Sequence, residues 1–401
     1  MLGTFCTWGM AWSYGIFAAY YKAILMPDES LSRLAWIGSM QLFLLFLVGQ
    51  PIGMAIDRGH FRVFPIAGAV ILVAGIFATS FCKVWWHFFV AQGLVTGTGM
   101  GFIFSSGAIC LLDWFVVNAG KALALAAGGS AFGAMIYTAM FIKLTLKIGF
   151  PWTMRAMGFL TLGLVIPPAA TLRLRKPRKL DPLRHAFLPD TQKRALERDT
   201  LRAYANPAFV CMTLGLFCAF WGLYFAIAYF PIYSIEILGL SGPKSANILI
   251  ALSATNLFGR LIPGIISDAC IGPLNTMVPC CLLSAAFTIV WIWSSTEGSL
   301  YVVACFYGLA SGGISALFNP IIQTFCLDQK TTMGGKTGFV FVIIGFACLT
   351  GNPIGGALVR PERGRQAYLP AQLFAGLSLL VAAGLLSVSR VLKAGMAANR
   401  V

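Results

Sequence analysis

The chain has 401 residues, of which 58% are hydrophobic and only 10% are charged, whereas soluble domains carry about 25% charged residues. This composition excludes an ordinary soluble domain and is typical of a protein that crosses a membrane many times. The net charge is +16, and ten of the 29 lysine and arginine residues lie in one loop, between Arg173 and Arg202. Clustered positive charge beside membrane spans is a topology signal, so we expect a lipid bilayer as the partner, and not nucleic acid.

Apolar segments of about 20 residues, each long enough to cross a bilayer, follow one another along the chain. We therefore predict an all-α membrane protein with twelve transmembrane helices, at about 3–26, 34–56, 63–82, 85–112, 122–146, 152–174, 207–230, 245–268, 275–294, 300–325, 337–359 and 369–390. The only sizeable polar interruption divides six helices from six. The expected domains are an N-terminal half at 1–174, a cytosolic linker at 175–206 and a C-terminal half at 207–401.

The basic residues also predict the orientation of the helices. If Met1 is cytosolic, the inner segments hold 18 lysine and arginine residues and the outer segments hold ten. Cytosolic loops are enriched in positive charge, so we expect both termini and the stretch 175–206 to lie in the cytosol. We expect an integral, multi-pass protein of the plasma membrane, which the sequence does not distinguish from a vacuolar membrane.

The eighth predicted helix carries one arginine, Arg260, well inside its apolar run. At about 100° per residue, Arg260 shares one helix face with Ser253, Asn256 and Ser267. An arginine inside a membrane helix costs about 2.5–3.5 kcal/mol on insertion scales, so it normally faces the protein interior or a water-filled cavity. Either Arg260 lines a transport pathway and attracts an anionic substrate, assisted by Asn256, or it is a structural residue. A structural Arg260 would pack against a carboxylate or extend toward the cytosolic surface.

The two halves of the chain repeat one pattern at equivalent positions. Gly53-x-x-x-Asp57 ends the second predicted helix, and Gly264-x-x-x-Asp268 ends the eighth, each just after a proline. The glycines and the aspartates are both separated by 211 residues. Parallel repeats of this kind are a known transporter design, in which the substrate site lies near the midplane between the halves.

The stretch Gly53-Met-Ala-Ile-Asp57-Arg58-Gly59-His-Phe-Arg62 resembles the Gly-x-x-x-Asp-Arg-x-Gly-Arg-Arg signature of the major facilitator superfamily, with Gly59 one place early. The resemblance implies that superfamily's fold of two six-helix pseudo-repeats. Asp57 would meet a helix N-terminus, whose partial positive charge favours an anion, in one conformation only. A charged turn that obeys the positive-inside rule is the simpler alternative. The residues expected to form a conformational gate are Gly53, Asp57, Arg58, Lys121, Gly264 and Asp268.

Three further stretches resemble the monocarboxylate transporter family, most closely its fungal branch. They are Trp114-Phe115 with Lys121 and the small-residue run around Gly129-Ser130; Thr7-Trp8-Gly9 with Ser13-Tyr14-Gly15; and Asn256-x-x-Gly259-Arg260-x-x-Pro263-Gly264. The resemblance implies transport of a monocarboxylate or a related organic-anion metabolite, often coupled to protons. Animal members carry an aspartate at the position of Asn256 and a lysine in the first helix. The aspartate is absent here, and the inner part of the first helix has no lysine, since Lys22 lies near its outer end. Proton symport, facilitation and exchange therefore stay open.

Other side chains are candidates for the same cavity. Trp8, Trp12 and Tyr14 in the first helix would stack on a ring-bearing substrate, although tryptophan at a membrane interface is an equally good explanation. The tenth predicted helix carries two glycines, Ser315 and Asn319 on one side. Glycines at such spacing more often form a packing groove than a pathway, whereas Asn319-Pro320 could open backbone carbonyls to a cavity.

The sequence indicates no enzyme, no metal site and no cofactor. Most of the eleven cysteines lie in apolar runs as small hydrophobic residues, and the three histidines are far apart. No catalytic set or nucleotide-binding loop is suggested. Two alternatives to a transporter stay open: a non-transporting receptor or sensor on the same fold, and an inactive form truncated in the first helix, because Met1 falls where that helix should already be under way.

Overall fold

The computed structural model describes residues 1–57, 61–115, 119–174, 204–326 and 333–395. Within these ranges all regular structure is helical and no strand is found. Eight helices of this part are long and apolar enough to cross a membrane, and two shorter apolar helices, Leu31–Leu47 and Val63–Thr79, accompany them. The all-α class that the sequence predicts is therefore confirmed.

The elements before residue 175 begin with a helical run made of α1 (Leu2–Thr4), η1 (Phe5–Gly9), α2 (Met10–Trp12), α3 (Tyr14–Tyr20) and η2 (Tyr21–Leu25). There follow α4 (Leu31–Leu47), α5 (Gly49–Asp57), α6 (Val63–Thr79), α7 (Trp85–Phe88), η3 (Phe89–Thr96), α8 (Gly97–Trp114) and α9 (Ala119–Thr171). The expected second helix, 34–56, is thus divided at Val48 into α4 and α5.

The elements after residue 203 are α12 (Pro207–Glu236), α13 (Gly242–Ile266), η4 (Ser267–Ile271), α14 (Pro273–Val290), η5 (Trp291–Trp293), α15 (Glu297–Cys326), α16 (Met333–Leu358), η6 (Pro361–Gln366) and α17 (Leu369–Ala394). Proline lies inside several of these helices, at Pro231 of α12, Pro263 of α13 and Pro353 of α16. Such prolines are tolerated in membrane helices, where neighbouring groups satisfy the freed carbonyls.

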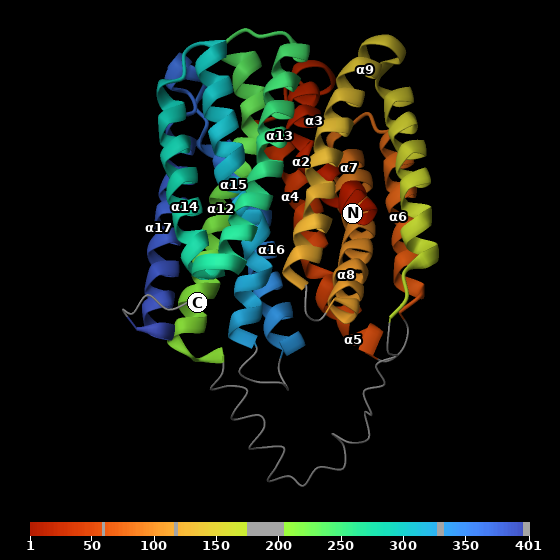
Figure 1. Ribbon diagram of the computed structural model, residues 1–401. Coiled ribbons are helices and arrows are strands. Elements are labelled where there is room, and N and C mark those ends of the chain that lie inside the picture. The colour runs from red at the N-terminus through yellow and green to blue at the C-terminus, as the bar shows by residue number, and fades with distance from the viewer. Residues whose placement is uncertain (58–60, 116–118, 175–203, 327–332, 396–401) are drawn as a thin grey trace.

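Local sequence explains where several helices begin or turn. The Ser30 hydroxyl accepts a hydrogen bond from the Arg33 amide, 3.2 Å away, and so caps α4. Asn206 caps α12 through the Ala208 amide at 2.9 Å, with a proline as the first helical residue. Gly149 interrupts α9 with a φ of 75°, a left-handed conformation that glycine adopts without strain. The chain turns back there, at the upper end in Figure 1.

Figure 1 shows the elements up to α9 on one side of the molecule and α12 to α17 on the other. The two groups meet where α4 packs along α16, α9 along α13 and α3 along α12. Aromatic rings fill much of this contact. Phe46 of α4 lies 5.8 Å from Phe220, 6.1 Å from Phe318 and 5.6 Å from Phe341, measured between ring centroids.

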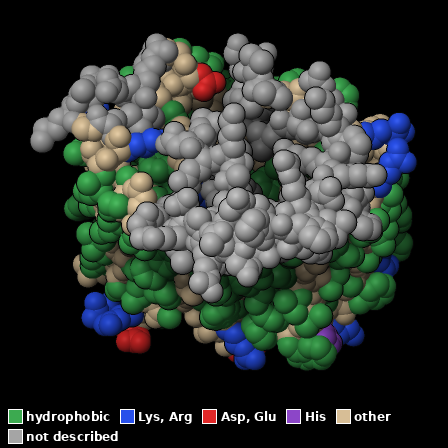
Figure 2. Space-filling model, turned by 90° about the horizontal axis from the view of Figure 1, so that it is seen from below, with side chains coloured by type: hydrophobic (Ala, Val, Ile, Leu, Met, Phe, Trp, Pro, Cys, Tyr) green, Lys and Arg blue, Asp and Glu red, His purple; other side chains and the backbone are tan. Residues whose placement is uncertain are grey.

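The outward-facing side chains of the helices are largely apolar. Leu146, Ile265 and Trp293 are 73%, 68% and 71% exposed, and Figure 2 shows hydrophobic side chains covering the flanks, with basic ones toward the margins. In water such a surface would be unfavourable, whereas lipid tails accept it. The protein is therefore an integral, multi-pass membrane protein.

Candidate substrate-binding cavity

A cavity of about 440 Å³ lies between the two groups of helices. Its wall combines α1, η1, α8 and α9 from one group with α12, α13 and α15 from the other. Most of the lining is apolar, and its described residues include no acidic side chain and no histidine. The lining residues include Leu2, Thr4, Trp8, Ile103, Phe104, Leu111, Ser130, Leu172, Tyr224, Arg260, Ser315 and Asn319.

The cavity reaches toward one end of the molecule. Leu111 lies near the end of α8 and Leu172 just after α9, so the cavity extends toward the end where both helices finish. The opposite end is tightly packed. There the Ser32 hydroxyl donates a hydrogen bond to the Pro353 carbonyl at 2.8 Å, and Gly15 packs so closely on the Ile227 carbonyl that a Cβ would clash.

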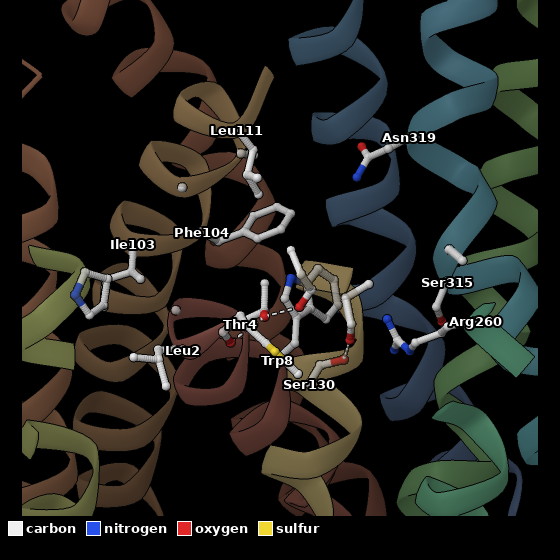
Figure 3. A pocket seen from close by; sticks show the side chains of 18 of the residues that line it. Leu2, Thr4, Trp8, Ile103, Phe104, Leu111, Ser130, Arg260, Ser315 and Asn319 are labelled. Atoms are coloured by element: carbon white, nitrogen blue, oxygen red, sulfur yellow. Dashed lines mark hydrogen bonds between the residues drawn. The ribbon is translucent and has the colours of Figure 1, made fainter. Parts of the chain in front are cut away.

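Arg260 lies in the cavity wall and is only 4% exposed. Its helix face is buried as the spacing predicts, since Ser253, Asn256 and Ser267 are buried too. Its Nε donates a hydrogen bond to Asn256 Oδ1 at 2.8 Å, and in the described part of the chain it forms no ion pair. Figure 3 shows the guanidinium pointing across the cavity toward Trp8 and Ser130.

Asn256 does not line the cavity and contacts Arg260 on the side away from it. While its side-chain oxygen accepts from Arg260, its Nδ2 donates to the Gly308 carbonyl at 3.1 Å and to Ser311 Oγ at 3.2 Å. Both the oxygen and the nitrogen of the Asn256 amide are therefore already engaged in hydrogen bonds within the protein. The position of Asn256 therefore suits orientation of the arginine better than the direct substrate contact that the sequence suggested.

Trp12 forms a platform beneath the guanidinium. The Arg260 Cζ lies 5.1 Å from the centroid of the indole ring, within the range of a cation–π interaction. The ring is 1% exposed and is absent from the cavity lining. Trp12 thus contacts the arginine, and stacking of a substrate on its face is not supported by this geometry.

The two remaining candidates, Asn319 and Tyr14, differ in whether they line the cavity. Asn319 lines the cavity, and Figure 3 shows its amide facing the open space. Tyr14 does not: its ring packs on Gly38 of α4, and its hydroxyl donates to the Leu34 carbonyl. Tyr14 therefore holds α3 against α4 in this structure.

Tyr224 of α12 is a lining residue that the sequence did not single out. Its ring packs edge-to-face on Trp12, with the centroids 6.1 Å apart. Among the described residues its hydroxyl has no hydrogen-bond partner. Unlike Trp12 Nε1, the hydroxyl oxygen is not among the fully buried polar atoms that lack a partner. The segment 217–230 holds seven aromatic residues, so no spacing signal distinguishes this tyrosine.

The family model of the Major Facilitator Superfamily matches residues 1–335 of the chain. The protein belongs to this superfamily. It is 34% identical to an MFS-type transporter of Gibberella zeae, over 94% of this chain and 81% of the relative. The Fujikurins efflux protein of Gibberella fujikuroi is 29% identical over 97% and 80%. The Aspyridones efflux protein of Emericella nidulans is 30% identical over 92% and 72%.

The expected gate of this superfamily member is described only in part. Gly53 and Asp57 lie in α5 and Lys121 lies in α9, but the side chains of Asp57 and Lys121 and the surroundings of Gly53 are outside the described residues, as is all of Arg58. The counterparts after residue 203 are described. A Cβ on Gly264 would meet open space, and Asp268 is exposed in η4. Among the described residues, none therefore packs closely on Gly264.

Proposed function

We propose that this superfamily member exports an organic-anion metabolite, such as a monocarboxylate or a larger ring-bearing acid, by alternating access. The observation that carries the proposal is a buried guanidinium in the cavity wall without a described counter-charge. A buried cation is costly unless it is paired, so an anion that enters the cavity gains a partner and relieves this cost. The two relatives named as efflux proteins support export over a receptor role.

The proposed architecture has twelve spans in two six-helix halves, residues 1–174 and 207–401, joined by a cytosolic linker at 175–206. The turn at Gly149 supports two passes within α9, and the run from Leu2 to Leu25 and the two shorter apolar helices supply the spans beyond the eight long ones. With both termini cytosolic, the cavity of this conformation opens inward. Substrate would then be collected from the cytosol, which suits an exporter at the plasma membrane.

Alternating access requires the packed end to open as the cavity end closes. The contacts of Ser32 with Pro353 and of Gly15 with Ile227 would break in that step. The proposed gate of Gly53, Asp57, Arg58, Lys121, Gly264 and Asp268 would close the inner end, with Asp57 meeting a helix N-terminus, whose partial positive charge favours an anion. Neutralisation of Arg260 by substrate lowers the cost of sealing the cavity from water.

Proteoliposomes that contain the full chain and are loaded with radiolabelled acetate, pyruvate, benzoate or 2-naphthoate test this proposal. Because the charge on Arg260 attracts the anion, Arg260→Gln should lower carboxylate flux at least twentyfold, while Arg260→Lys retains part of it. Arg155→Gln is the matched control, because the Arg155 guanidinium also lies over aromatic rings, 4.8 Å from Trp152 and 4.9 Å from Phe81, but does not line the cavity.

Equal flux through wild-type and Arg260→Gln protein would remove Arg260 from the site and with it the proposed substrate class. Flux measured with and without a pH gradient decides the coupling. A proton symporter or antiporter follows the gradient, whereas a facilitator or exchanger of the anion does not require one.

A further inference from the structure

Three polar side chains in the cavity wall have no described protein partner, and all three come from the same side. In the described part of the chain, the terminal nitrogens of Arg260, the Tyr224 hydroxyl and the Asn319 amide form no hydrogen bond. The lining hydroxyls differ, since Ser130 donates to the Ala127 carbonyl and Ser315 to the Ser311 carbonyl. The free donors therefore gather on α12, α13 and α15.

Trp12 brings two of these donors to one place. Its ring contacts the Arg260 guanidinium at 5.1 Å and the Tyr224 ring at 6.1 Å, both measured to the ring centroid. Trp12 lies on α2, close to the boundary between the two groups of helices. A group with two hydrogen-bond acceptors, such as a carboxylate, can therefore bind Arg260 and Tyr224 at the same time.

The opposite wall is apolar and comes from other elements. Trp8 of η1 and Phe104 of α8 pack edge-to-face with their centroids 5.4 Å apart, and Leu2, Ile103 and Leu111 extend this surface. Figure 3 shows Trp8, Phe104 and Leu111 facing Arg260, Ser315 and Asn319 across the cavity. A cavity of about 440 Å³ between these walls has room for a body much larger than a two- or three-carbon acid.

We propose that the cavity binds an amphipathic organic acid across its width, with the acid group on Arg260 and Tyr224 and a ring-bearing apolar body on Trp8 and Phe104. This inference rests on the proposed export function and narrows its substrate class. Tyr224 is the second head-group contact, and Phe104 determines the preference for a large body. Small monocarboxylates fill only the head-group position and bind weakly.

Binding of radiolabelled 2-naphthoate to the purified full chain in lipid nanodiscs tests the inference, with unlabelled acetate and 2-naphthamide as competitors. Acetate should compete at least a hundredfold more weakly than 2-naphthoate, because it buries no aromatic surface. The neutral 2-naphthamide should compete at least tenfold more weakly, because it lacks the charge that pairs with Arg260.

Two variants test separately the contact to the acid group of the ligand and the contact to its apolar ring. Tyr224→Phe should weaken 2-naphthoate about tenfold, as loss of one hydrogen bond to a charged group predicts, with Tyr301→Phe in α15, outside the cavity, as control. Phe104→Leu should weaken 2-naphthoate at least fivefold and leave acetate competition unchanged. Phe159→Leu is its control, because Phe159 is 60% exposed on the outer surface.

Each outcome bears on one of the two proposals. Equal competition by acetate and 2-naphthoate, no binding of 2-naphthoate, or unchanged affinity in both Tyr224→Phe and Phe104→Leu would overturn the inference. Each would leave the export function standing if the liposomes still transport other acids in an Arg260-dependent way. Absence of Arg260-dependent flux for every acid in the panel would instead overturn the proposed function, and the inference with it.

Discussion

Asn256 decides how much of the Arg260 charge is available to a ligand. As an amide it fixes Nε at 2.8 Å without neutralising the cation. A carboxylate at the same place would form an ion pair inside a poorly hydrated helix contact, where charges interact strongly. The residue type at this position therefore sets whether the cavity presents a net positive charge.

We predict that Asn256→Asp lowers the affinity for 2-naphthoate at least tenfold, because the internal carboxylate competes with the ligand for Arg260. Equilibrium binding in nanodiscs measures the effect. Asn275→Asp is the matched control, since Asn275 accepts from Arg390 Nε at 3.0 Å in the same manner but does not line the cavity. Unchanged affinity in Asn256→Asp would mean that Arg260 is not the anion site.

The burial of the helix face that carries Arg260 could be predicted from the sequence, but the residues of other helices that lie near Arg260 could not. Polar residues three and four apart on an apolar helix have one physical explanation, burial against protein. Trp12 and Tyr14 are two residues apart and therefore point to different sides of their helical run, so the two side chains do not share a role. Tyr224 lies in an aromatic-rich helix, and only tertiary packing reveals which ring reaches the cavity.

At the scale of helices, α13 and α15 are held together by glycines. Gly259 packs on the Leu309 carbonyl, Gly308 on the Leu252 carbonyl and Gly312 on the Asn256 carbonyl, each too closely for a Cβ. Small residues that allow close backbone approach are a main source of helix association in membranes. The predicted stripe on the tenth helix thus divides in two, because Gly308 and Gly312 pack on α13 while Ser315 and Asn319 line the cavity.

We predict that Gly259→Ala destabilises the protein by about 1–3 kcal/mol, since the new methyl group forces α15 away from α13. The unfolding temperature in detergent, measured by fluorescence of a thiol-reactive dye, should fall by several degrees. Gly384→Ala in α17 is the control, because a Cβ there meets open space, and this change should be neutral or slightly stabilising. Equal unfolding temperatures for the two variants would contradict the packing argument.

For the whole molecule, we expect the packed end to influence which conformation is populated. The described contacts at that end are short-range: Gly15 on Ile227, and Gly356 with a would-be Cβ 2.6 Å from the Ser32 amide nitrogen. Steric contacts of this kind lose their stability over fractions of an ångström. An added methyl group there should therefore shift the equilibrium between the open and closed conformations of this end.

We predict that Gly15→Ala opens this end, because its methyl group clashes with the Ile227 carbonyl. A cysteine placed at Ser32, in a background without other accessible cysteines, should react with a membrane-impermeant maleimide at least fivefold faster in the Gly15→Ala protein. The same cysteine combined with Gly384→Ala should react at the original rate. No change in either would show that this end does not gate access.

How much of the fold the sequence can predict depends on the scale. Composition and span length are enough for the all-α membrane class, and the Gly-x-x-x-Asp-Arg signature for the superfamily, because both are local properties. The aromatic cluster around Phe46 and the cavity itself arise where segments hundreds of residues apart meet. Their existence follows from tertiary packing, for which the apolar runs of a membrane helix carry little directional information.

The cavity takes its charge from α13 and its aromatic surface from η1 and α8, which lie in different groups of helices. In the proposed alternating-access cycle the two groups rotate apart, and a substrate that contacts both must then lose its contacts with one of them. A long acid that contacts both groups would therefore bind with higher affinity but be transported more slowly. A short acid contacts α13 alone and keeps its contacts during the movement. Among acids of increasing body length, maximal export rate and affinity should consequently run in opposite directions.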